Sequence, residues 1–135
     1  MQLPEACYRT SVKALILDED GRFLLQRESN GKWEMPGGGL DHGESVEDGL
    51  RREVMEESGL TITKMAAQPS YFVTKKYKET WKSNVYYVCE LENLDITPTE
   101  ECEGVRFFSV EETDEVELFP IIQEFVKVFD PKNHV

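Results

Sequence analysis

The feature that most constrains the fold is a run of three glycines followed by a helix whose last turn is crowded with acid. Gly37–Gly39 carry no side-chain bulk, so the backbone there can bend sharply or approach a ligand closely. Ser45 is a suitable N-cap with Asp48 three residues later, and Gly59 stands where a left-handed C-cap is expected. These signals predict a helix between Ser45 and Gly59. Its apolar stripe is Val46, Leu50 and Val54.

The acidic residues of this helix conflict with its stability. Glu53, Glu56 and Glu57 stand at positions i, i+3 and i+4, so they project from one face of the helix. Like charges at this spacing destabilise a helix by a few tenths of a kcal/mol per pair, roughly, and the negative end of the helix dipole adds a similar cost. A solvated acidic face is one interpretation. A site for Mg²⁺ or Mn²⁺ is the other, because carboxylate oxygens suit these cations.

The segment from residue 38 to residue 60 resembles a Nudix box. The family pattern is Gly, five residues, Glu, seven residues, Arg-Glu-aliphatic, one residue, Glu-Glu, one residue, Gly-aliphatic. This chain matches the pattern without insertion. The matching residues are Gly38, Glu44, Arg52, Glu53, Val54, Glu56, Glu57, Gly59 and Leu60.

The resemblance implies an enzyme that cuts a pyrophosphate bond in a nucleoside diphosphate linked to another group, using Mg²⁺ or Mn²⁺. By position, Glu53, Glu56 and Glu57 would be metal ligands, with a backbone carbonyl from Gly37 or Gly38. Glu44 and Arg52 would form an ion pair that supports the box. Glu53 or Glu57 is the expected general base. An acidic loop outside the box remains an alternative source of the base or of an extra ligand; its members are Glu100, Glu101 and Glu103.

The rest of the chain predicts one α/β or α+β domain, residues 1–135, with a mixed sheet and a helix on each face. Residues 11–17 and 22–27 are expected to form a hairpin around the turn at residues 18–21. Further strands are expected at residues 60–65, 70–74, 84–89 and 105–108, and a last helix starts at Pro120. The family resemblance implies an α/β/α sandwich with a catalytic loop-helix-loop and a C-terminal helix.

Substrate contacts are expected on three residues outside the box. Arg27 ends the second strand, where many family members place an arginine that meets a phosphate, and Glu101 lies in the acidic loop. Tyr77 occupies the place where dinucleoside polyphosphate hydrolases tend to carry a tyrosine, whereas Lys75 stands where ADP-ribose hydrolases tend to carry a proline. The substrate therefore stays open among nucleotide sugars, dinucleoside polyphosphates and nucleoside triphosphates.

Composition limits the partners. The 135 residues carry a formal charge of -12, which disfavours long nucleic acid because such ligands are attracted by basic patches. No segment resembles a signal peptide or a membrane span, so we expect a cytoplasmic protein that acts on a small nucleotide as a monomer or a homodimer. Three cysteines without CxxC spacing predict free thiols. A Nudix module that binds nucleotides without cutting them is the alternative function.

Overall fold

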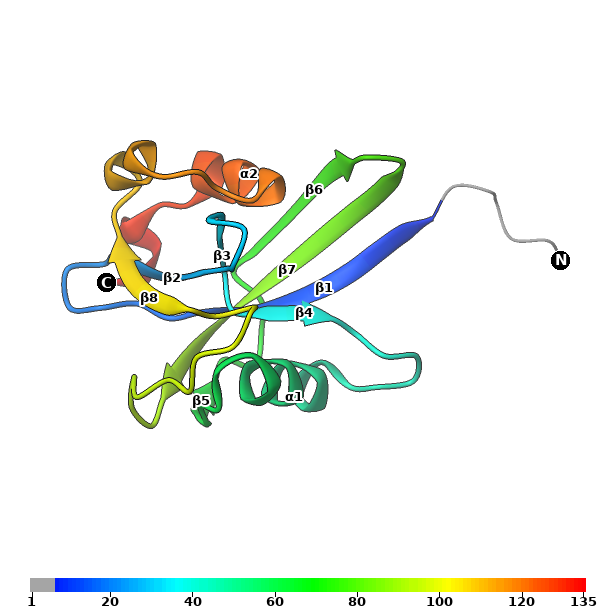
Figure 1. Ribbon diagram of the computed structural model, residues 1–135, viewed down its shortest axis with the longest axis horizontal. Coiled ribbons are helices and arrows are strands. Elements are labelled where there is room, and N and C mark those ends of the chain that lie inside the picture. The colour runs from blue at the N-terminus through cyan, green and yellow to red at the C-terminus, as the bar shows by residue number, and fades with distance from the viewer. Residues whose placement is uncertain (1–6) are drawn as a thin grey trace, which may run out of the picture.

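The strands form two sheets in the computed structural model, which describes residues 7–135 (Figure 1). The larger sheet has the order β4 (Gly37–Gly39), β1 (Tyr8–Leu15), β7 (Thr80–Leu91) and β5 (Ile62–Met65), and β6 (Tyr71–Tyr77) also pairs with β7. The smaller sheet has the order β3 (Trp33–Glu34), β2 (Phe23–Arg27) and β8 (Gly104–Phe108). Because β1 runs parallel to β7 while the other pairs are antiparallel, the larger sheet is mixed, as expected.

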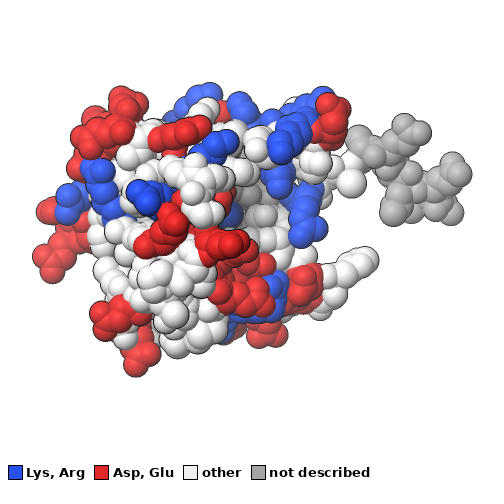
Figure 2. Space-filling view, viewed as in Figure 1, with Lys and Arg blue, Asp and Glu red and all other residues white. Residues whose placement is uncertain are grey.

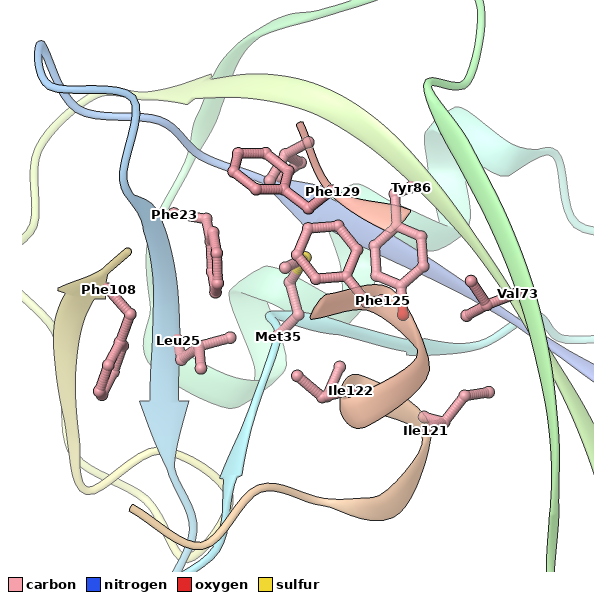
Figure 3. Close-up of a cluster of buried hydrophobic side chains, with 11 residues drawn as sticks. Phe23, Leu25, Met35, Val73, Tyr86, Phe108, Ile121, Ile122, Phe125 and Phe129 are labelled. Atoms are coloured by element: carbon pink, nitrogen blue, oxygen red, sulfur yellow. The ribbon is translucent and has the colours of Figure 1, made fainter. Parts of the chain in front are cut away.

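Two helices lie on opposite sides of the strands, α1 (Val46–Ser58) and α2 (Pro120–Val128) (Figure 1). Leu50 and Val54 of α1 pack with Val12 and Ala14 of β1 in one buried apolar cluster. The α2 side contains a second cluster (Figure 3), whose buried members are Leu15, Phe23, Leu25, Met35, Val73, Tyr86, Phe108, Ile121, Ile122, Phe125 and Phe129. The α/β arrangement with a helix on each face is therefore confirmed.

Aromatic rings tie α2 to both sheets. The Phe125 ring of α2 lies 5.2 Å from the ring of Phe23 in β2 and 4.6 Å from the ring of Tyr86 in β7, measured between centroids. Figure 3 shows these side chains between the strands and the helix. Since large rings bury much apolar surface, the Phe125 ring packs α2 against a strand of each sheet.

Helix α1 begins and ends where its caps predict. The Ser45 hydroxyl accepts a hydrogen bond from the Asp48 backbone N–H at 3.1 Å. Gly59 adopts a left-handed conformation with φ of 75°, and its N–H donates to the carbonyl of Met55. These local contacts end the helix directly after Glu57 and Ser58, so the acidic turn is placed at the helix C-terminus.

The expected hairpin at the start of the chain is wrong in part. The turn forms, with the Gly21 N–H donating to the Asp18 carbonyl at 3.1 Å and Gly21 at φ of 77°. Beyond the Leu17–Phe23 bridge, however, β1 and β2 enter different sheets. The reason is that β4 and β7 occupy the two edges of β1, so no edge remains for β2.

The limits of the other strands differ from the expected ones by a few residues, and some strands were not predicted. The hairpin partner strands β6 and β7 are longer than expected, and the glycine run forms the strand β4 because it pairs with residues 11–13 of β1. Cys89 and Cys102 are buried, Cys7 is exposed, and all three thiols are free. Within residues 7–135, no helix has the length and apolar character that crossing a membrane requires.

Candidate functional site

The glycine strand approaches helix α1 so closely that side chains are excluded. Gly37 has a φ of 124°, and a Cβ added to it would overlap the carbonyl oxygen of Val12 in the neighbouring strand. A Cβ on Gly38 would lie 2.5 Å from Oε2 of Glu53. The absence of a side chain at Gly37 therefore allows the close pairing with β1, and its absence at Gly38 lets the Glu53 carboxylate of α1 lie directly against the backbone of β4.

Glu57 is the buried acid of the site. Its Oε1 accepts a hydrogen bond from the Gly37 N–H at 2.9 Å, and its Oε2 accepts one from the Gln26 side-chain amide at 3.0 Å. Only 6% of Glu57 is exposed. Burial raises the pKa of the Glu57 carboxyl to about 8, although the nearby Lys13 charge and the Gly37 hydrogen bond oppose the shift. The charge of Lys13 and the Gly37 hydrogen bond thus do not fully offset the cost of burying the ionised Glu57 carboxylate.

Arg52 organises the remaining acids of the helix. Its guanidinium binds both oxygens of Glu44, at 2.7 and 2.8 Å, and its Nη1 lies 3.0 Å from Glu53 and 3.3 Å from Glu56. The Arg52 hydrogen bonds lower the pKa of Glu44 to about 2. Arg52 also donates to the carbonyl of Gly39 at 3.3 Å. One cation thus joins the loop before α1 to the last turns of the helix.

The carboxylates of this site suit a hard divalent cation as ligands, although their oxygens do not converge on a single position. Within the described part of the chain, no three Asp, Glu, His or Cys side chains converge as ligands. Arg52 holds Glu53 and Glu56, while Glu57 faces Gly37. All the available donors are oxygens, and the buried Glu57 carboxyl lacks a full counter-charge, so the chemistry fits Mg²⁺ or Mn²⁺. Such a cation would require Glu56, whose side chain is 58% exposed, to turn from Arg52.

The acidic loop reaches the site because hydrogen bonds hold it to α1 and β2. The Thr99 hydroxyl donates to the Glu57 carbonyl at 2.7 Å, the Ser29 N–H donates to the Glu100 carbonyl at 2.8 Å, and the Glu103 N–H donates to the Arg27 carbonyl at 2.7 Å. The charge of the exposed Glu101 contributes to the raised pKa of Glu57. The tertiary structure therefore brings Glu101 near the box.

Arg27 and Tyr77, the other expected substrate residues, have protein partners. The Arg27 guanidinium lies 3.1 Å from a carboxylate oxygen of Glu103, and both side chains are exposed. The ring of Tyr77 lies 5.0 Å from the ring of Phe119, at the end of β6 and beside the start of α2. Arg27 is thus near the acidic loop, whereas Tyr77 lies outside the contacts that join β4 to α1.

Two buried polar residues of the site were not predicted from the sequence. Gln26 of β2 is 1% exposed and donates to Glu57, and Lys13 of β1 is 5% exposed and lies beside the glycine strand. A signal existed for both, because Lys13 stands between the apolar residues Val12 and Ala14, and Gln26 follows an apolar run at residues 23–25. Buried polar groups of this kind need partners, which makes them informative about a site.

Charge is unevenly distributed on the surface that faces the viewer in Figure 2. Lys and Arg side chains gather over the β6–β7 hairpin, and Asp and Glu side chains dominate elsewhere. The basic residues of this hairpin are Lys75, Lys76, Lys78 and Lys82. The local field at this hairpin therefore differs from the average implied by a charge of -12.

Comparison with known proteins identifies the family of this chain. Residues 8–129 match the model of the NUDIX domain family. The chain belongs to the Nudix family. It is 30% identical over 125 residues to "Nucleoside triphosphatase NudI" of Escherichia fergusonii, an alignment that covers 82% of this chain and 88% of that protein.

Two further relatives support this membership. A "MutT-like protein" of Streptomyces ambofaciens is 45% identical over 56 residues, which are 41% of this chain and 36% of that protein. The crystal structure of the MutT protein from Methanosarcina mazei Go1 superposes with a TM-score of 0.79 at 30% identity, covering 98% of this chain and all of that one. This Nudix protein is thus a hydrolase of pyrophosphate bonds with the Nudix fold.

Proposed function

We propose that the protein hydrolyses the phosphoric anhydride bond of a small nucleotide in a reaction that depends on Mg²⁺ or Mn²⁺, and that a nucleoside triphosphate is the favoured substrate. The observation that carries the proposal is the approach of Glu53 and Glu57 to the Gly37–Gly38 backbone. The relatives named nucleoside triphosphatase, which align over most of this chain, support the substrate. Nucleotide sugars and dinucleoside polyphosphates are the competing substrates.

Glu53, Glu56, Glu57 and the Gly38 carbonyl would hold the cation. The Gly37 carbonyl accepts a hydrogen bond from Lys13 at 3.2 Å. The Gly38 carbonyl is therefore the favoured backbone ligand for the cation. The bound ion would offset the negative charge of the phosphate oxygens and make a neighbouring water a stronger acid. Arg52 and Glu44 would keep the loop and the helix in register through the ion pair that joins them.

A carboxylate of the site would take the proton from the attacking water. Glu53 and Glu57 are the first candidates because both lie against the glycine strand, and Glu101 remains a candidate from the acidic loop. A base must reach its proton directly or through one water; Glu53 and Glu57 belong to the acidic turn of α1, and the charge of Glu101 acts on Glu57. We assign Glu53 and Glu57 as the catalytic pair.

Arg27 would release Glu103 and bind a substrate phosphate in its place. The exposed Arg27–Glu103 pair is weak enough for such an exchange, since surface ion pairs contribute about 0–1 kcal/mol. We expect Arg27→Ala to raise KM for the best substrate more than about tenfold, which corresponds to the loss of one charge-assisted contact. An unchanged KM would assign Arg27 to the surface. Tyr77 has the weaker case because it packs on Phe119.

A substrate panel tests the proposed function. Nucleoside triphosphates, deoxynucleoside triphosphates, nucleotide sugars, ADP-ribose and dinucleoside polyphosphates are each incubated with Mg²⁺ or Mn²⁺. Phosphate release is read after coupling to inorganic pyrophosphatase for the triphosphates and to a phosphomonoesterase for the other classes. Turnover of triphosphates above the other classes is the expected result. Turnover confined to another class would correct the substrate. No turnover, together with measurable nucleotide binding, would favour the non-catalytic sensor.

A further inference from the structure

Lys13 places a buried cation beside the glycine strand, opposite Gly37 in the neighbouring strand β1. Its Nζ donates to the carbonyl oxygens of Met35 at 3.3 Å and Gly37 at 3.2 Å, and it lies 3.6 Å from Oε1 of Glu34. The side chains of Lys13 and Glu34 are only 6% and 8% exposed. Burying an ammonium group costs several kcal/mol, roughly, unless it is paired and hydrogen-bonded, and these three partners offset that cost.

The same contacts hold the backbone that presents a hydrogen bond to Glu57. The Pro36 carbonyl and the Gly37 N–H belong to one peptide group; its oxygen accepts from the Ala14 N–H at 2.8 Å, and its N–H donates to Glu57 at 2.9 Å. Lys13 holds the carbonyls on either side of that group. The orientation of the peptide before Gly37 is thus fixed by β1, the neighbouring strand in the sheet.

We propose that Lys13 is a positioning residue of the metal site, which acts on Glu57 through the Met35–Gly37 backbone. Its ammonium group locks the three successive carbonyls of that segment together with Ala14, so that the Gly37 N–H points at Glu57 and the Gly38 backbone lies against Glu53. The inference rests on the proposed function in one respect, because it assumes that these glutamates bind a divalent cation.

The alternative role for Lys13 is a counter-charge alone. The two roles predict opposite signs for cation binding when Lys13 is replaced by Met. Loss of a nearby positive charge removes repulsion and strengthens the binding of a divalent cation. Loss of the backbone orientation separates the ligands and weakens that binding, as mutations of supporting residues around metal sites do. The direction of the change therefore separates the roles without any reference to turnover.

The experiment compares Lys13→Met, Glu34→Gln and the double variant with the unaltered protein. The double variant removes one positive and one negative charge, so the net local charge is kept while the hold on the Met35 and Gly37 carbonyls is lost. Mn²⁺ binding to the metal-free proteins is measured by titration calorimetry, and folding by the Tm without metal. We expect the double variant to bind Mn²⁺ about 10- to 100-fold more weakly and to lose kcat by a similar factor with little change in KM.

Lys64→Met is the matched control, because Lys64 also pairs with a glutamate but lies exposed on β5. It should leave Mn²⁺ binding unchanged. Binding in the double variant at or above that of the unaltered protein overturns the inference, as does Glu34→Gln alone producing the whole loss. A double variant that does not fold overturns it too, because Lys13 would then serve the fold. If the unaltered protein binds no Mn²⁺, the proposed function fails instead.

Discussion

The Glu57 carboxylate accepts a hydrogen bond from the Gly37 N–H at 2.9 Å and thereby joins the last turn of α1 to the first residue of β4. The second oxygen of Glu57 accepts from Gln26 of β2, in the other sheet. One carboxyl group thus connects a helix and both sheets. The position and the raised pKa of Glu57 depend on how the helix and the two sheets pack around it. A substitution of Glu57 therefore tests the whole site.

Glu57→Gln should lower kcat by about 10²–10⁴, the range that a positioned acid or base contributes. The metal-free fold should survive at neutral pH, because the neutral amide resembles the protonated carboxyl that burial favours there. Steady-state kinetics with Mg²⁺ and the Tm in a chelator give the two readings. Glu47→Gln, on the exposed side of the same helix, is the control and should keep full activity. A near-normal kcat for Glu57→Gln would contradict the proposed catalytic role of this residue.

The stability of the metal-free protein should fall as pH rises through 8. The pKa of Glu57 is raised from an ordinary 4.5 to about 8 on folding, so between these values the folded state binds more protons than the unfolded state. The stabilisation from Glu57 is complete below pH 4.5 and is lost as pH rises through about 8. Thermal melts in a chelator from pH 5 to pH 9 should show this slope, and Glu57→Gln should flatten it. Parallel profiles for the two proteins would contradict the prediction.

Gly37→Ala and Gly38→Ala should fail in different ways. At Gly37 the φ of 124° and the overlap with the backbone of Val12 cannot be relieved, so we expect a loss of at least about 2 kcal/mol in the free energy of unfolding. At Gly38 the obstacle is the end of the flexible Glu53 side chain, so the fold should persist while activity falls about 10- to 100-fold.

Gly104→Ala controls for the substitution itself, because nothing lies within 4 Å of a Cβ at that position. Chemical denaturation and kinetics on the three variants separate loss of fold from loss of the site. Full activity in Gly38→Ala would show that the Glu53 carboxylate does not need its place against β4.

Glu44→Gln should weaken the contact between helix α1 and the loop that precedes it. Arg52 would lose both hydrogen bonds to a charged acceptor, and we expect kcat to fall about 10- to 100-fold with a lower Tm. Because Arg52 depresses the pKa of Glu44 from 4.5 to about 2, this stabilisation is present above pH 4.5 and disappears as pH falls through about 2. The Tm difference between the two proteins should therefore narrow over that interval. A constant difference down to pH 2 would argue against the ion pair as its source.

Helix α1 shows how far local chemistry carries a sequence-based prediction. Ser45 and Gly59 act within a few residues of themselves, so the helix limits followed from the chain alone. The hairpin of β1 and β2 shows the opposite. Its turn at Gly21 was predicted correctly, but the strands diverge because the competition for the edges of β1 involves β4 and β7, which lie far along the chain.

The order of residues by itself determined the box, its helix and its acidic face, since spacing along a helix sets which side chains share a side. Only the tertiary structure decided which acid is buried. Glu57 is enclosed because Gln26, Gly37 and the loop at Thr99 converge on it, whereas Glu56, from the same turn, faces solvent. Burial and pKa depend on distant segments that pack around a group, and the same holds for the place of Lys13 beside the glycine strand.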